Sequence, residues 1–196
     1  MAAIGAKTAF VFSGGGSLGA IQAGMLRVLL SYGLKPDFVV GASVGAINAS
    51  YFASAPDAEC VARLERIWCG LRRADIFPFT LTSAFGLIRH RGYIVDPSKL
   101  RRVIETNLPC SRIEDARIPL HIMATTQQGI GIRLSSGPAV DAILASTAIP
   151  GVFPVVNING DPLMDGAVAA NTPVRLAADL GASRLRGRIC AWRGLR

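Results

Sequence analysis

The feature that most constrains the fold of this chain is a serine flanked by glycines, Gly41-Ala42-Ser43-Val44-Gly45. Residues 37–40 are apolar and β-like, and residues 44–53 are rich in small side chains and helical in pattern. Glycines two positions either side of the serine allow a tight turn and close packing of neighbouring segments. The pattern predicts a strand, a sharp turn and a helix, with Ser43 as a nucleophile at the helix N-terminus. A serine that only caps the helix is the alternative.

A second strand-to-helix junction lies nearer the N-terminus. The apolar run at residues 8–12 leads into a glycine-rich loop and then into a helical pattern over residues 17–30. The loop contains the Gly-x-Gly-x-x-Gly fingerprint of dinucleotide-binding folds. That fingerprint requires an acidic residue at the end of the next strand, and here the next strand ends in Gly41-Ala42-Ser43. We therefore disfavour nucleotide binding.

The glycine loop suits a different use. Successive glycine N–H groups can converge on one point and stabilise an anion. Both junctions should emerge at the carboxyl edge of one parallel sheet, which places the loop beside Ser43. The loop is therefore predicted to form an oxyanion hole from Gly14, Gly15, Gly16 and Gly19.

The general base has three candidates. His90 lies between two arginines, and His121 lies in an apolar strand pattern that favours a buried core histidine. Asp165 is stronger, because it ends a predicted hairpin over residues 155–164 and is followed by Gly166; a turn aspartate is its alternative role. An ordinary aspartate has a pKa of about 3.9, so burial must raise it or the oxyanion hole must do most of the work.

Taken in order, three motifs resemble the patatin-like phospholipase family of bacterial type. They are the loop at residues 14–19, the elbow at residues 41–45 and the element Asp165-Gly166-Ala167. The resemblance implies a three-layer α/β/α fold, Ser43 as nucleophile, Asp165 as proton acceptor, and no metal or cofactor. It also implies hydrolysis of lipid esters, of the phospholipase A or lysophospholipase type, through an acyl-enzyme. Leu18 stands where many family members carry Arg or Lys.

The C-terminal residues depart from that pattern. The resemblance covers residues 7–182, as one domain, and residues 183–196 form a basic tail. A central strand is excluded for this tail, because its charges would be buried without partners. We therefore expect a truncated fold, and a catalytically inactive protein that binds lipid or a partner is the alternative function.

Composition bears on partners and location. Five of the eight net positive charges lie in the last thirteen residues, which leaves +3 for the rest, and no nucleic-acid partner is expected. Four scattered cysteines, no leader and no long apolar run favour a cytoplasmic protein with reduced thiols. Residues 72–95 mix aromatic side chains with arginines, which suits a lid, a peripheral membrane contact or a plain loop. The oligomeric state stays open.

Overall fold

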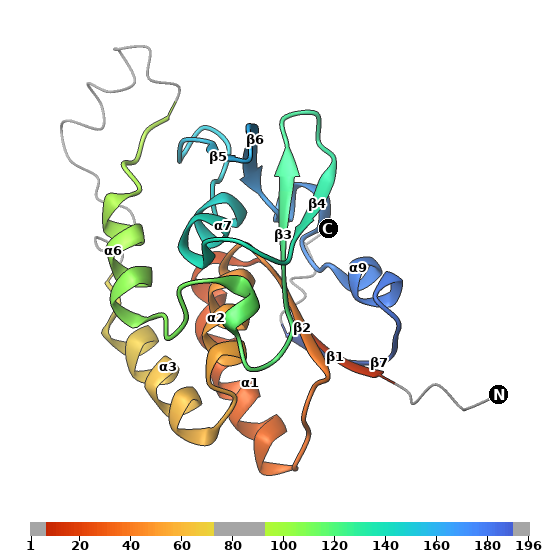
Figure 1. Ribbon diagram of the computed structural model, residues 1–196. Coiled ribbons are helices and arrows are strands. Elements are labelled where there is room, and N and C mark those ends of the chain that lie inside the picture. Colours follow the sequence, from red (N-terminus) through yellow and green to blue (C-terminus); the bar gives the residue numbers. More distant parts are fainter. Residues whose placement is uncertain (1–6, 73–92, 190–196) are drawn as a thin grey trace, which may run out of the picture.

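The computed structural model describes residues 7–72 and 93–189, and they form a mixed sheet with helices on both faces (Figure 1). Within these residues the sheet has seven strands in the order β5-β6-β3-β2-β1-β7, and β4 pairs with β3. The strands are β1 (Lys7–Phe12), β2 (Phe38–Ala42), β3 (Leu120–Thr126), β4 (Gly131–Leu134), β5 (Val156–Ile158), β6 (Asp161–Asp165) and β7 (Ala182–Ile189). The three-layer α/β/α prediction is confirmed.

The helices cover the two faces unequally. They are α1 (Gly19–Ser31), α2 (Val44–Ser54), α3 (Ala58–Gly70), α6 (Ser98–Asn107), α7 (Ala139–Ser146), α8 (Ala167–Ala170) and α9 (Val174–Asp179), with short 3-10 turns at Gly16–Leu18 and Ile113–Asp115. In Figure 1, α1, α2, α3 and α6 lie on one side of the sheet and α9 lies on the other. The strands β7, β1, β2 and β3 are mutually parallel, whereas β4, β5 and β6 add antiparallel pairs.

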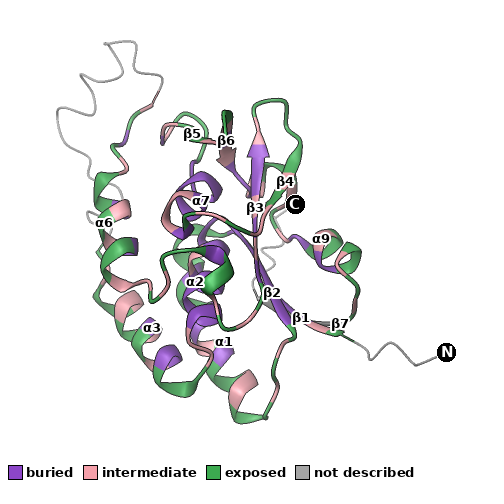
Figure 2. Ribbon diagram, in the orientation of Figure 1, coloured by how far each residue is buried: buried purple, intermediate pink, exposed green. Residues whose placement is uncertain are grey.

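Helix α2 is the centre of the main core. Almost every residue of α2 is buried (Figure 2), as expected for a helix that is apolar or small all round. Phe52 on α2 packs against Phe10 and Phe12 of β1, with ring centroids 6.1 Å and 6.5 Å apart. These aromatic contacts therefore hold α2, the helix that follows the predicted nucleophile, against the sheet.

The predicted hairpin is present. It joins β5 to β6 through Asn159 and Gly160, which have φ values of 55° and 94°. Two consecutive positive φ values define the tight hairpin turn for which Asn-Gly is the preferred sequence. The antiparallel pairing of β6 with β3, with Ala124 opposite Asp165, then places the predicted base at the sheet edge where β2 ends.

The basic segment after residue 182 differs from the prediction. Residues 182–189 form β7, which pairs with β1 and is the terminal strand in the sheet order among the described residues. The burial argument excluded a central strand, but an edge strand has a neighbour on one side only and leaves the other open to water. The chain thus continues the sheet through part of the segment that we expected to be a separate tail.

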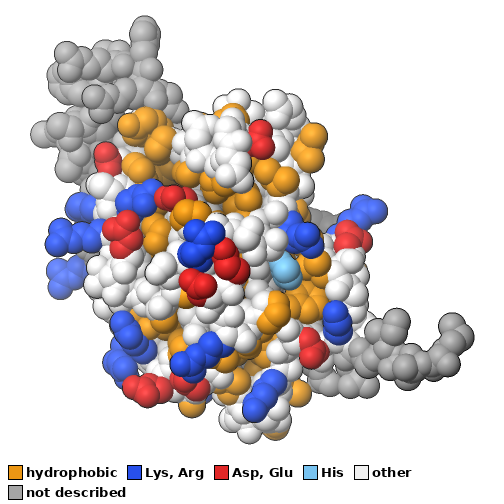
Figure 3. All heavy atoms as spheres, in the orientation of Figure 1, with side chains coloured by type: hydrophobic (Ala, Val, Ile, Leu, Met, Phe, Trp, Pro, Cys, Tyr) orange, Lys and Arg blue, Asp and Glu red, His pale blue; other side chains and the backbone are white. Residues whose placement is uncertain are grey.

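On the face shown in Figure 3, Asp and Glu side chains lie among the Lys and Arg side chains, so the surface charge is mixed in sign. Arg101 pairs with Asp141 at 2.7 Å, and Arg112 pairs with Glu114 at 2.7 Å. Among the residues that the structure describes, no helix is both long and apolar enough to cross a bilayer. His90 and most of the predicted lid lie outside the described residues.

Candidate active site

Ser43 lies in the turn between β2 and α2 with φ 54° and ψ −129°. A positive φ is costly for a residue with a side chain, and it persists only where the surroundings enforce it. The flanking glycines provide that enforcement. A Cβ on Gly41 would lie 2.5 Å from the carbonyl oxygen of Gly45, and one on Gly45 would clash with the backbone of Phe12. The predicted elbow is therefore present, and both glycines are sterically required.

Asp165 is hydrogen-bonded to Ser43. The Ser43 hydroxyl donates to Oδ2 of Asp165 over 2.7 Å, and the backbone N–H of Ala167 donates to Oδ1, also over 2.7 Å. Both side chains are buried, with residue exposures of 8% for Ser43 and 3% for Asp165. The two residues are 122 positions apart in the chain. The arrangement suits proton transfer from the hydroxyl to the carboxylate, since both atoms lie within hydrogen-bonding distance.

Burial raises the pKa of Asp165 above its ordinary value, because it penalises the charged carboxylate. The hydrogen bonds from Ser43 and Ala167 stabilise the carboxylate and offset part of this shift. The direction is the one that a general base near neutral pH requires. Burial is one of the two ways in which an aspartate was expected to become a stronger base.

The four glycines of the loop have different roles. Gly15 and Gly16 are exposed, with φ values of 156° and 57°, and within the described residues no acceptor is assigned to their N–H groups. These two amides are therefore the candidates for an oxyanion hole. Gly14 is a correction: its N–H donates to the carbonyl of Asn171 over 2.8 Å and cannot serve the oxyanion.

Gly14 and Gly19 are instead packing positions. A Cβ on Gly14 would lie 2.5 Å from Oδ1 of Asn171 and 3.3 Å from Cβ of Ser43. A Cβ on Gly19 would lie 2.5 Å from Val44 and 2.6 Å from Trp68. The N–H of Gly19 is used within the turn, where it bonds to Gly16. Both glycines bring the loop close to the elbow, and neither supplies a donor.

Ser146, at the end of α7, is a site residue that the sequence prediction missed. Its hydroxyl accepts from the Ser43 N–H over 2.9 Å and donates to the Met123 carbonyl over 2.6 Å. Its own carbonyl accepts from the N–H of Gly166 over 3.1 Å. Ser146 thus bridges the nucleophile turn and the segment that carries Asp165. The end of an apolar helix carries no signal that would have singled it out.

A buried network of polar side chains is hydrogen-bonded to both ends of the glycine loop. The amide nitrogen of Asn48 donates to the Gly19 carbonyl over 2.9 Å and to Oε1 of Gln22 over 2.8 Å, and Asn48 Oδ1 accepts from the Trp68 indole. Gln22 in turn donates to the Ser13 carbonyl over 2.8 Å. Asn48 and Gln22 are fully buried, so the network stabilises one conformation of the loop.

His121 lies away from the dyad. Its ring meets the edge of Phe38 at a centroid distance of 5.8 Å, and Phe38 belongs to the apolar cluster beneath α9. Burial, and then the positive charge of Arg133, lower its pKa below the usual histidine value. The predicted core histidine is found only in part, because His121 is half-buried and its Nδ1 has no hydrogen-bond partner among the described residues. The hydroxyl of Ser43 is instead engaged by Asp165.

A cavity of about 430 Å³ opens beside Ser43. Its other lining residues come from the glycine loop, α1, α2, α3, α6 and the segment after α7, and most are apolar: Gly16, Ser17, Ala20, Val44, Ile47, Trp68, Leu71, Arg72, Leu100, Thr147, Ile149 and Phe153. Its volume lies within the range of about 300–1,000 Å³ that small-molecule sites occupy. Ser43 therefore lines a space suited to an apolar group.

Comparisons with known proteins identify a family and relatives of this chain. The family described as patatin-like phospholipase matches residues 10–178. Lysophospholipase NTE1 of Mycosarcoma maydis is 27% identical over 182 residues, which are 91% of this chain and 9% of that protein. A patatin-like phospholipase domain-containing protein of Caenorhabditis elegans is 27% identical over 176 residues, or 88% of this chain and 16% of that protein. The chain thus spans a small part of these relatives.

Structural similarity points the same way. The crystal structure of VipD from Legionella pneumophila superposes with a TM-score of 0.58, covering 84% of this chain and 46% of that one. At 16% identity this similarity shows a shared fold. Since the family match extends over most of the chain and includes the glycine loop, the elbow and the Asp165 element, the chain belongs to the patatin-like phospholipase family.

Proposed function

We propose that this chain is a serine acyl hydrolase that cleaves lipid carboxylic esters of the phospholipase A or lysophospholipase type. The observation that carries the proposal is the buried 2.7 Å hydrogen bond from Ser43 to Asp165, at a positive-φ turn that faces a largely apolar cavity. The family match and a relative named lysophospholipase support the same class of substrate.

The proposed reaction uses the Ser43–Asp165 hydrogen bond and the two exposed loop amides. Ser43 Oγ attacks the ester carbonyl while its proton passes to Oδ2 of Asp165, the acceptor of its hydrogen bond. The N–H groups of Gly15 and Gly16 bind the negative oxygen of the tetrahedral intermediate. Asp165 then gives the proton to the departing alcohol. In the second half, water donates a proton to Asp165 and attacks the acyl-enzyme, and Ser43 leaves with that proton.

The first test is covalent labelling of the purified protein with a fluorophosphonate, with the adduct located by peptide mass spectrometry. We expect one adduct on Ser43 and none in Ser43→Ala. Lysophosphatidylcholine hydrolysis should be lost in Ser43→Ala and reduced at least a hundredfold in Asp165→Asn, since general-base catalysis contributes about 10²–10⁴-fold. A folded protein that takes no label and hydrolyses no ester would support a non-catalytic lipid- or partner-binding protein instead.

Location and membrane contact are further proposals. A lipid substrate is drawn from an aggregate or a bilayer, so we propose a cytoplasmic protein that meets membranes peripherally. Sedimentation with liposomes of phosphatidylcholine, with and without anionic lipid, tests this contact directly. Protein that stays entirely in the supernatant at both compositions would contradict it.

A further inference from the structure

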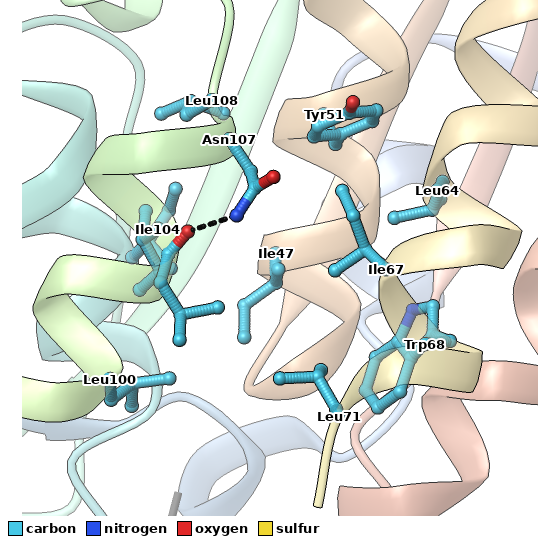
Figure 4. Close-up of a pocket in the computed structure, with 12 residues that line it drawn as sticks. Ile47, Tyr51, Leu64, Ile67, Trp68, Leu71, Leu100, Ile104, Asn107 and Leu108 are labelled. Carbon is cyan, nitrogen blue, oxygen red and sulfur yellow. Dashed lines mark hydrogen bonds between the residues drawn. The ribbon is translucent and has the colours of Figure 1, made fainter. Parts of the chain in front are cut away.

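A second, smaller cavity lies deeper between α2, α3 and α6 (Figure 4). Its volume is about 40 Å³. Four of its lining residues, Ile47, Trp68, Leu71 and Leu100, also line the cavity beside Ser43. The two cavities are thus neighbours that share one wall. The smaller is larger than the ~10–15 Å³ that one water molecule needs, and an apolar cavity of this kind stays dry and accepts apolar ligands.

Three helices supply apolar stripes to this deep cavity. Helix α2 contributes Ile47 and Tyr51, and α3 contributes Leu64, Ile67 and Trp68. Helix α6 contributes residues at positions 100, 103, 104 and 107, which are apolar except for Asn107; the spacing is helical in all three cases. In Figure 4, Leu71 and Leu100 lie at one end of the cavity and Tyr51 and Leu108 at the other. The cavity therefore extends away from the wall that it shares with the Ser43 site.

The distance from Ser43 to the far end of the deep cavity can be worked out along helix α2. Ser43, Ile47 and Tyr51 are four residues apart and lie on one face of the helix, at the catalytic site, the shared wall and the far end respectively. At a rise of 1.5 Å per residue, Tyr51 lies about 12 Å beyond Ser43. A fully extended chain of single bonds advances by ~1.2 Å per bond, judging from ~3.5 Å for the three bonds of a residue. An extended acyl chain of this length has roughly ten carbons.

We propose that the α2–α3–α6 cavity is the subsite for the methyl end of the acyl chain, and that its far wall limits the preferred chain to about ten carbons. This inference rests on the proposed function for its ester substrate. Chains much longer than decanoyl meet Tyr51, Asn107 and Leu108, whereas short chains leave the deep cavity empty. Because burying one methylene is worth about fourfold in binding, chain-length preference is the property that the cavity controls.

Val103 offers a selective change, since it lines the deep cavity and not the cavity beside Ser43. In Val103→Phe the larger ring fills the subsite. The ratio of kcat/KM for decanoyl to butanoyl esters should then fall about tenfold or more, and the optimum should move to shorter chains. The control is Arg102→Phe, which places the same side chain one position earlier on the exposed face of α6 and should leave the ratio unchanged.

Leu108→Ala tests the opposite direction and serves also if Val103→Phe does not fold. It removes part of the far wall, so the optimum should move toward dodecanoyl and longer esters. A profile that rises steadily to hexadecanoyl in the unmodified protein, or one that neither variant shifts, would overturn the subsite while leaving the hydrolase proposal intact.

A binding measurement separates the two proposals. In Ser43→Ala, calorimetric titration should show decanoate binding at least tenfold more tightly than hexanoate, and adding Val103→Phe should abolish the difference. If no ester is hydrolysed by the protein with Ser43 but this binding difference is present, the proposed activity fails and the subsite is upheld. If hydrolysis is observed and the binding difference is absent, the subsite is refuted and the activity is upheld.

Discussion

Replacing Ser146 by alanine tests whether one buried hydroxyl maintains the geometry of the elbow. The substitution removes the acceptor of the Ser43 N–H and the donor to the Met123 carbonyl. Each hydrogen bond contributes about 1 kcal/mol net, and each buried backbone group left without a partner costs about 1–3 kcal/mol. The free energy of unfolding should therefore fall by about 2–4 kcal/mol. For a domain of this length, Tm should fall by roughly 5–15 °C.

Ser50→Ala is a matched control on α2. Ser50 and Ser146 are both fully buried helix serines, but the Ser50 hydroxyl has no hydrogen-bond partner among the described residues. Removing it exchanges an unpaired buried hydroxyl for a methyl-bearing side chain, so Tm should stay the same or rise. The chemical change is identical at the two positions, and only the contacts differ.

The assay is thermal unfolding followed by circular dichroism, together with kcat for a short-chain ester. Ser146→Ala should lower kcat at least tenfold at a temperature where it is still folded, because a small displacement of the nucleophile is costly to the rate. Ser50→Ala should retain kcat. Equal Tm values for the two variants would refute the reasoning, since the Ser146 bridge would then contribute nothing that an unpaired hydroxyl does not.

Three further outcomes are expected. Asp165→Asn should be more stable than the unmodified protein near pH 7. Burial raises the pKa of the Asp165 carboxyl, so its ionised form destabilises the fold. The difference in Tm between the two proteins should shrink as the pH falls toward about 3.9, the ordinary pKa of an aspartate. Gly14→Ala should abolish activity, because its Cβ would lie 2.5 Å from Asn171 Oδ1, whereas Gly24→Ala on α1, where a Cβ meets nothing within 4 Å, should be neutral or stabilising in thermal unfolding. His121→Gln should retain most of kcat, and a folded variant without activity would contradict the Ser43–Asp165 dyad.

The parts of the site that sequence predicts are those set by local rules. The elbow needs glycines within two residues of Ser43, and the hairpin before Asp165 needs Asn159 and Gly160 at its turn, so both features are visible in short stretches. The proximity of the loop at residues 14–16 to Ser43 follows from topology, because neighbouring parallel strands end at the same edge. The direction of the Asp165 pKa shift also follows, once the carboxyl is known to be buried.

The parts that sequence does not predict depend on contacts between distant residues. The N–H of Gly14 could not be known to bond Asn171, which comes from the end of α8, and that bond decides which glycines can serve the oxyanion. Ser146 is 103 residues from the Ser43 N–H that it accepts from. The edge position of β7 likewise depends on which strand it joins, and the charge of residues 183–189 excluded only a central place.

Helix α2 explains how chemistry and chain-length preference can be separated in one small domain. Its N-terminus carries Ser43, and one and two turns later the same face carries Ile47 and Tyr51. The helix is held by Phe10 and Phe12 on one side and by the hydrogen bonds of Asn48 on another. A substitution on α6, such as Val103→Phe, therefore changes the cavity from the side of α6 and leaves these contacts of α2 in place. The nucleophile should keep its geometry while the preferred acyl chain changes.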